Sequence, residues 1–264
     1  MKRFSDGYRA VFAVLCILVF LFAVLSLFFY LDDRYREQMS EELSFMTECG
    51  GDSGHTACIS AASSSDIVFR TGDTGSNRLA ITCNVDWGEE VLPDMLDVLD
   101  EYNVKITFFV TGHWAEKNPK LLRTMYLKGH EIQSHGYSHK LCSQVSDKEV
   151  EEEMDRTSDA VFRIIGVRPD IFAPPSGDFD ESTVEICRKK GYLLSLWSAD
   201  TIDWRQDSTA DVIYSRIMKK DLHGAILLMH PKEETLKALP RLLDAFQEQN
   251  LSPVTLSTLI RDQE

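Results

Sequence analysis

From Asn77 onward the sequence alternates short β-rich runs with longer amphipathic stretches, and this alternation limits the folds open to the chain. Strands separated by helices pair in parallel through right-handed crossovers. About seven strands in about 190 residues predict a distorted, incomplete parallel β/α barrel, with an open doubly wound sheet as the alternative. The predicted strands are 79–85, 105–111, 131–134, 170–173, 193–198, 224–229 and 252–256, and the predicted helices are 89–102, 114–128, 147–165, 180–190, 209–221 and 234–249.

Residues that carry chemistry gather where these strands end. In a β/α barrel the carboxyl ends of all strands share one face, and the active site lies there. The sequence therefore predicts an enzyme-like site at that face. The residues at strand ends are Asn84, Asp86, His135, Asp200, Asp203 and His230.

Two histidines four residues apart indicate a metal centre. His135 and His139 lie in the run Ser-His-Gly-Tyr-Ser-His, and imidazole is the commonest protein ligand for a borderline divalent metal. Asp86 would be the third ligand, leaving coordination positions for water and substrate. The pattern predicts one divalent metal, zinc first and cobalt or manganese as alternatives. The competing interpretation is a pair of surface histidines on a loop.

His230 follows the strand 224–229, where an imidazole is placed to protonate a leaving group. Asp203 would orient its ring. A structural role is the alternative for His230, and turn formation or helix capping is the alternative for Asp200 and Asp203.

Aromatic and proline residues next to these positions suggest a sugar-binding surface. Trp87 and Trp204 each lie beside a candidate acid, and flat aromatic faces suit the apolar faces of sugar rings. Core packing is the other role open to them. Pro174 and Pro175 stiffen a loop that we expect to contact substrate, and Ser176 with the following glycine permits a tight turn.

An N-terminal apolar run predicts a membrane anchor. Residues 10–31 carry no charge, are long enough to span a bilayer, and follow Lys2, Arg3 and Arg9. We therefore expect a cytoplasmic N-terminus at 1–9, a transmembrane helix at 10–31 and an extracytoplasmic remainder. A cleaved signal peptide is the alternative, but its apolar core is shorter and ends in small residues. The Gly/Ser-rich composition further along predicts a stalk over 32–77 and a catalytic domain over 78–264.

Charge and cysteine content exclude some partners. The net charge of −14 argues against nucleic acid and against an electrostatic hold on anionic lipid. Cys49 and Cys58 could form a disulfide in an oxidising location. Cys83 follows an apolar run, which predicts a buried, small hydrophobic residue and not a nucleophile. Nothing in the sequence indicates the oligomeric state.

Taken together, these segments resemble the polysaccharide deacetylase family, carbohydrate esterase family 4, which includes chitin and peptidoglycan deacetylases. The resemblance spans roughly 77–259. The segment 105–112 is similar to the family's second strand, 135–139 to its histidine motif, and 200–204 and 227–230 to its last two motifs. The resemblance implies a metal-dependent barrel that removes acetyl groups from N-acetylated amino sugars.

Three positions depart from the family pattern. Asn84 stands where the family carries an aspartate base, and an amide cannot take up a proton at neutral pH. Ala173 stands where an arginine pairs with that base, and Ser176 replaces an aromatic residue. Losing both members of one ion pair is consistent, because either charge left alone and buried would be costly.

The sequence thus supports two main hypotheses. The first is a membrane-anchored, metal-dependent deacetylase of a cell-envelope glycan, peptidoglycan or a chitin-like polymer, in which Glu89, Glu90 or His230 assists in place of the base. The second is a non-catalytic metal- and glycan-binding module derived from a deacetylase. Hydrolysis of a small amide that is not a sugar is a weaker third.

Overall fold

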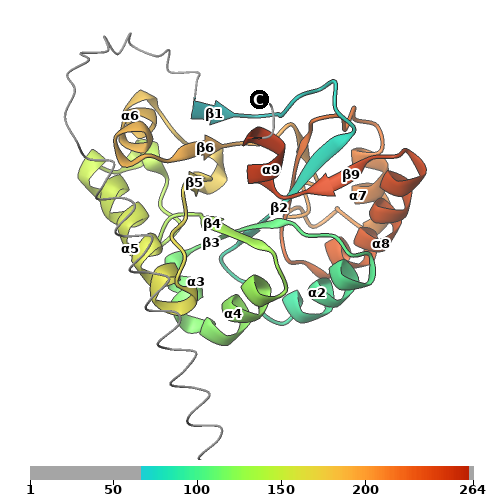
Figure 1. Ribbon diagram of the computed structural model, residues 1–264, viewed down its shortest axis with the longest axis horizontal. Coiled ribbons are helices and arrows are strands. Elements are labelled where there is room, and N and C mark those ends of the chain that lie inside the picture. The colour runs from blue at the N-terminus through green and yellow to red at the C-terminus, as the bar shows by residue number, and fades with distance from the viewer. Residues whose placement is uncertain (1–66, 262–264) are drawn as a thin grey trace, which may run out of the picture. The chain divides into compact units, whose positions relative to one another are not determined.

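A computed structural model describes residues 67–261, in which helices pack around a curled sheet of parallel strands (Figure 1). The strand order is β1-β6-β5-β4-β3-β2-β8-β7, with β9 also paired to β2. The strands are β1 (Val68–Phe69), β2 (Arg78–Val85), β3 (Thr107–Val110), β4 (Glu131–Ser134), β5 (Ile171–Phe172), β6 (Leu193–Ser195), β7 (Ala199–Asp200), β8 (Ile226–Met229) and β9 (Ser252–Val254).

The sheet curls back towards itself through one interrupted strand. Residues 196–198 alone separate β6 from β7, yet β6 pairs with β1 and β5 whereas β7 pairs with β8, on the other side of β2 in the strand order. The stretch 193–200 therefore contributes β6 near one end of the strand order and β7 at the other end. The expected distorted, incomplete α/β barrel of parallel strands is confirmed as a curled parallel sheet, with nine strands in the described residues where about seven were predicted.

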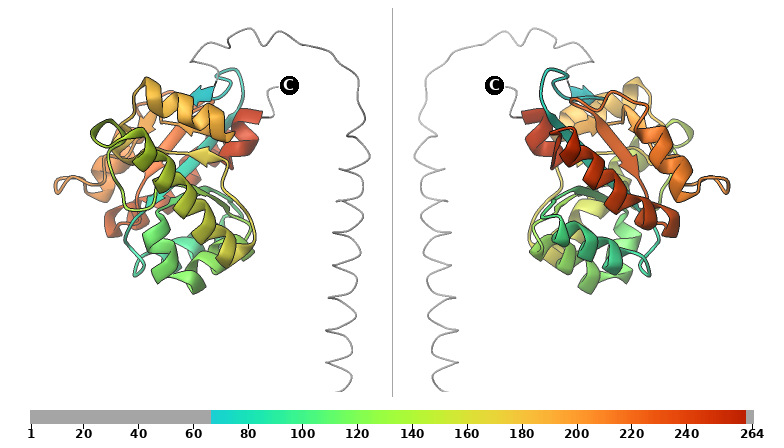
Figure 2. Two further views of the ribbon diagram at one scale, coloured as in Figure 1. Left: turned by 90° about the vertical axis from the view of Figure 1, so that its left-hand side faces the viewer. Right: turned by 90° about the vertical axis from the view of Figure 1, so that its right-hand side faces the viewer.

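Eight helices of the described residues follow or flank these strands. Figure 2 shows α5 and α6 on one side of the unit and α7 and α8 on the opposite side. They are α2 (Leu92–Glu101), α3 (Gly112–Lys117), α4 (Pro119–Leu127), α5 (Asp147–Ile165), α6 (Glu181–Lys190), α7 (Ala210–Ile217), α8 (Glu233–Glu248) and α9 (Leu256–Arg261), with short 3₁₀ turns η2 (Cys142–Gln144) and η3 (Pro175–Gly177).

Local sequence signals explain several of these boundaries. Ser146 caps α5 in a capping box with Glu149, and Gly166 ends it in the left-handed region at φ 77°. The predicted helix 114–128 is divided into α3 and α4 because Pro119 has no N–H and disfavours helical geometry at Asn118.

Part of the segment 67–77, which was predicted to be stalk, pairs with the sheet. β1 pairs with β6, and Thr71 forms a bridge with Ala225. The strand β1 has two residues, which is too short to show the alternation by which a strand is recognised.

The remaining N-terminal predictions fall outside the described residues. These are the cytoplasmic segment 1–9, the transmembrane helix 10–31, the stalk up to residue 66 and the Cys49–Cys58 disulfide. In the stretch 67–261, no helix has the length and apolar character needed to cross a membrane.

The central strand β2 runs through the packed core and ends at Val85. Leu79 through Val85 are all buried, which matches a parallel strand covered on both faces. Leu79 and Ile81 pack into the largest apolar cluster, with side chains of α2 and α8. Cys83 is buried in the same cluster, and burial raises the pKa of its thiol well above the ordinary value, which confirms a packing role.

A buried histidine before β4 makes stability depend on pH. His130 is 2 % exposed, its Nδ1 accepts the Ile106 N–H at 3.2 Å, and its Nε2 has no partner within residues 67–261. Burial lowers the pKa of His130 to about 4. Because the unfolded chain takes up this proton near pH 6.5, the free energy of unfolding falls as the pH drops from about 6.5 to about 4.

We expect this loss to reach about 3 kcal/mol, measured by urea denaturation at a series of pH values. His130→Asn keeps an acceptor for Ile106 but does not titrate, so its stability should vary less over that pH range. If the free energy of unfolding changed equally with pH in both proteins, His130 would not be the group responsible.

Candidate active site

A cavity of about 460 Å³ opens where the strands of the sheet end. It gathers side chains from β2, from the segment after β4, and from the segments after β7 and β8. Most residues predicted for the site from sequence line it, namely Asn84, Asp86, Trp87, His135, His139, Asp200, Trp204 and His230.

β2 delivers an amide and a carboxylate to this cavity. Asn84 is 6 % exposed, and its Oδ1 has no hydrogen-bond partner among the described residues. Asp86 accepts a hydrogen bond from the Thr111 hydroxyl at 2.7 Å. Thr111 is fully buried and also caps α3 by accepting from Trp114 N–H, so one threonine ties Asp86 to that helix.

The segment after β4 presents two imidazoles. His135 is 2 % exposed and donates from Nδ1 to the Ala173 carbonyl at 2.7 Å, which leaves Nε2 as its free ring nitrogen. Burial, with His139 nearby, lowers the pKa of His135 to about 3, so the ring is neutral at physiological pH. The ring centroids of His135 and His139 lie 5.1 Å apart.

The predicted metal ligands fit zinc in donor type. His135 has the engaged Nδ1 that orients a metal-binding imidazole, and His139 and Asp86 line the same cavity. Within residues 67–261, no group of three or more His, Cys, Asp or Glu side chains is arranged to hold a metal ion. The metal centre therefore stays a prediction.

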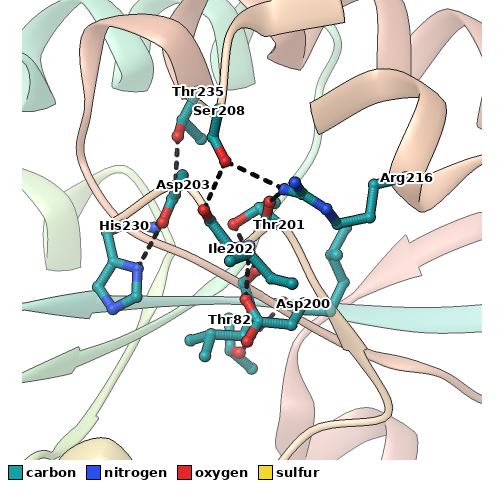
Figure 3. A network of polar contacts seen from close by, with 11 residues as sticks. Thr82, Asp200, Thr201, Ile202, Asp203, Ser208, Arg216, His230 and Thr235 are labelled. Carbon is teal, nitrogen blue, oxygen red and sulfur yellow. Dashed lines mark hydrogen bonds and ion pairs between the residues drawn. The ribbon is translucent and has the colours of Figure 1, made fainter. Parts of the chain in front are cut away.

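His230 and Asp203 form a second polar pair at the cavity (Figure 3). His230 donates from Nδ1 to Asp203 Oδ1 at 2.8 Å and from its backbone N–H to Oδ2 at 2.7 Å. The Thr235 hydroxyl donates to Oδ2 at 2.7 Å. Burial alone would raise the pKa of Asp203, but the hydrogen bonds from His230 and Thr235 outweigh it and lower that pKa. The Asp203 carboxylate therefore holds the His230 ring through Nδ1, which leaves Nε2 as the second ring nitrogen.

Asp200 has a turn-forming contact in this structure. Its Oδ1 accepts the Ile202 N–H at 2.7 Å, and burial raises the pKa of its carboxyl. Arg216 donates to the Thr201 carbonyl and to the Ser208 hydroxyl, which in turn donates to the Ile202 carbonyl (Figure 3). These bonds fix the loop that carries Asp203.

Both predicted tryptophans are at the site and partly open to solvent. Trp87 is 40 % and Trp204 60 % exposed. The Trp87 ring stacks near His230, with centroids 6.1 Å apart and planes 11° apart, and Lys232 Nζ lies 5.3 Å from the Trp87 centroid. Trp87 is therefore a wall of the cavity beside His230 and not core packing.

The proline pair shapes the cavity indirectly. Pro174 and Pro175 are buried and do not line the cavity, but Ser176, which follows at φ 57°, does. Trp197, which sequence reasoning did not single out, also lines it. A Cβ at Gly177 would lie 2.7 Å from the Trp197 ring, so glycine is needed there for the ring to fit.

Ala173 is 5 % exposed and packs in an apolar cluster with Phe109 and Ile171. Its carbonyl holds His135, as described above, while its methyl group offers no charge to Asn84. The position that the family resemblance assigns to an arginine therefore contributes apolar packing and a backbone carbonyl, but no charge.

Comparison with known proteins relates this chain to polysaccharide deacetylases. The family model described as polysaccharide deacetylase matches residues 71–195. The uncharacterized protein YlxY of Bacillus subtilis is 34% identical over 189 residues, covering 72% of this chain and 59% of its own length. A peptidoglycan-N-acetylglucosamine deacetylase of Bacillus cereus is 28% identical over 192 residues, covering 70% of each protein.

Solved structures of the same family also resemble this chain. BA3943 of Bacillus anthracis, described as a CE4 family pseudoenzyme, superposes with a TM-score of 0.71 at 30% sequence identity. The match covers 79% of this chain and 72% of that one. A BA3943 mutant described as having restored enzymatic activity also has a TM-score of 0.71, at 29% identity, covering 79% of this chain and 74% of its own.

Proposed function

We propose that this chain, which belongs to the polysaccharide deacetylase family (carbohydrate esterase family 4), is a hydrolase. Its reaction is the removal of N-acetyl groups from a cell-envelope glycan. The substrate we favour is peptidoglycan, since the B. cereus relative is named for that activity. The observation that carries the proposal is the His230–Asp203 pair at the same cavity as His135, His139 and Asp86.

The ligands of the proposed metal are Asp86, His135 and His139. A divalent ion held there, zinc in first place, supplies activation of water and polarisation of the acetamide carbonyl. His135 keeps its proton on Nδ1 through the Ala173 carbonyl, so Nε2 is free to bind.

His230 is the proton donor of the proposed reaction. Its Nδ1 is engaged by Asp203, so Nε2 is the nitrogen that can pass a proton to the departing amine. The Asp203 carboxylate stabilises the protonated ring. Trp87 beside His230 offers a flat face to the sugar ring that carries the acetamide.

A second candidate function is binding without turnover. Asn84 lies at the cavity with an unpartnered Oδ1, and Ala173 provides no charge. A 30% identical structural relative is described as a pseudoenzyme of the same family. These observations favour a glycan-binding module that keeps the metal ligands and lacks the base.

Acetate release separates the two candidates. We expect metal-dependent release from N-acetylglucosamine oligomers or peptidoglycan by a fragment of residues 61–264, which includes β1. Asp86→Ala should lower this release by about 10²-fold or more, because several kcal/mol of charge stabilisation is lost.

A zinc- or cobalt-loaded protein that binds peptidoglycan in a pull-down but releases no acetate from either substrate would favour the binding module. Release that is unchanged in Asp86→Ala would contradict the assignment of this carboxylate to the metal.

A further inference from the structure

The segment that joins the two candidate metal histidines is held by a buried carboxylate from another helix. Building on the proposed function, we propose that Glu153 of α5 is a positioning residue. Its carboxylate fixes residues 136–138 and thereby sets how His135 and His139 face the metal. Neither the reaction nor the ligand set assigns a role to this residue.

Three hydrogen bonds converge on the Glu153 carboxylate. Oε2 accepts the backbone N–H of Tyr137 at 2.8 Å and that of Ser138 at 2.6 Å. Oε1 accepts the Ser138 hydroxyl at 2.6 Å. Glu153 is 7 % exposed, so these bonds form where water competes poorly and charge strengthens them.

A different helix holds the carbonyls of the same segment. Gly112 N–H donates to the Gly136 carbonyl and His113 N–H donates to the Tyr137 carbonyl, each at 3.0 Å. Both donors belong to α3, so the carbonyls are satisfied from α3 and the amides from α5. The segment between the histidines is thus clamped from two sides.

The backbone of this segment needs such a clamp. Gly136 has φ 74°, and His139 has φ 58°, in the left-handed region that costs a residue with a Cβ free energy. A residue keeps this conformation only when its surroundings enforce it. Tyr137 and Ser138, which Glu153 holds, lie between Gly136 and His139. These hydrogen bonds therefore oppose relaxation of the backbone at His139.

The clamp is strongest with a carboxylate. A glutamine at 153 could keep its single oxygen at both backbone N–H groups only by turning its NH₂ group to the Ser138 hydroxyl, which would then accept instead of donate. The two backbone bonds would then lose the strengthening that a charged acceptor gives them. The imidazole of His139 would be presented with less precision, in the way that loss of an outer-shell partner weakens a metal site.

The test compares Glu153→Gln with Glu152→Gln in the full-length protein. Glu152 is the next residue of α5, is exposed, and pairs with Lys148 on the helix surface. Zinc affinity, measured by competition with a chromogenic chelator, should fall about 10-fold or more in Glu153→Gln. It should stay within about twofold in Glu152→Gln. Glu153→Asp, which keeps the charge, should lie between Glu153→Gln and the wild type.

Hydrogen exchange of the backbone amides provides a readout that does not depend on zinc. The Tyr137 and Ser138 amides should be protected in the wild type and in Glu152→Gln, and should exchange faster in Glu153→Gln. Thermal unfolding of each variant identifies any global loss of structure.

Equal zinc affinity in a folded Glu153→Gln would overturn the positioning role. A wild type that binds no zinc would overturn the metal of the proposed function instead. In that case the exchange of the two amides decides the inference, and unchanged protection in Glu153→Gln would overturn it.

Discussion

Replacing Asn84 with aspartate is expected to raise acetate release by roughly 10²- to 10⁴-fold, the contribution of a positioned general base. Asn84 lies at the cavity with the two histidines and cannot accept a proton, whereas a carboxylate at this position can. The position is 6 % exposed, so the new carboxylate would tend to stay protonated. Adding Ala173→Arg should counter this by pairing, and the double variant should exceed the single one.

The measurement is acetate release from peptidoglycan and from N-acetylglucosamine oligomers under saturating metal. Asn84→Ala is the matched control, because it removes the amide without providing a base. A double variant that gains turnover over an inert parent supports the binding module, and an already active parent rules that module out. Asn84→Asp releasing no more acetate than Asn84→Ala would contradict a base role at this position.

Removing the imidazole of His230 is expected to lower the turnover number by about 10²- to 10⁴-fold, with a small change in KM. The proton that His230 donates is needed when the carbon–nitrogen bond breaks, so the loss should appear in the chemical step. His230→Ala should be compared in the most active background, either the wild type or Asn84→Asp. Unchanged turnover would show that another group protonates the amine.

Asp203→Asn should have an effect of similar size. An amide can present its NH₂ group towards His230 Nδ1 and so favour the other tautomer of the ring. Thr235→Val is the control, since it removes one hydrogen bond to Asp203 Oδ2 and leaves both bonds from His230 in place. A Thr235→Val enzyme as impaired as Asp203→Asn would indicate a structural role for the whole cluster.

The sequence predicted those parts of the fold that local patterns encode. The boundaries of β4 and α5 coincide with the predicted 131–134 and 147–165, and α5 has a capping box that marks its start. β7 escaped recognition, like β1, because a two-residue strand shows no alternation. The predicted strand 252–256 stops at residue 254, since α9 begins at Leu256.

The same distinction holds for the site. His135 and His230 were predictable because each directly follows a recognisable strand, and Asp203 because it comes soon after the predicted strand 193–198. Thr111 and Trp197 were not, because their roles depend on which element packs against them in space. Glu153 lies in a run of acidic residues, a pattern that is typical of a solvent-exposed helix face.

One signal could have identified Glu153. It is three residues after Val150 and four before Thr157, both of which are buried on the inner face of α5. An acidic residue in that register needs a partner inside the fold.

The pairing of β1 has a consequence for how the chain assembles. Val68 pairs with Leu194, and Thr71 with Ala225, so β1 and the residues just after it are paired by partners that are made much later in synthesis. Pairings between residues so distant in sequence slow folding, because a long loop must close before they form. The unit cannot finish its sheet while the ribosome is still making β6. The order of synthesis therefore differs from the order of assembly, because β1 is made before every other described strand and is paired only after β6 has been made.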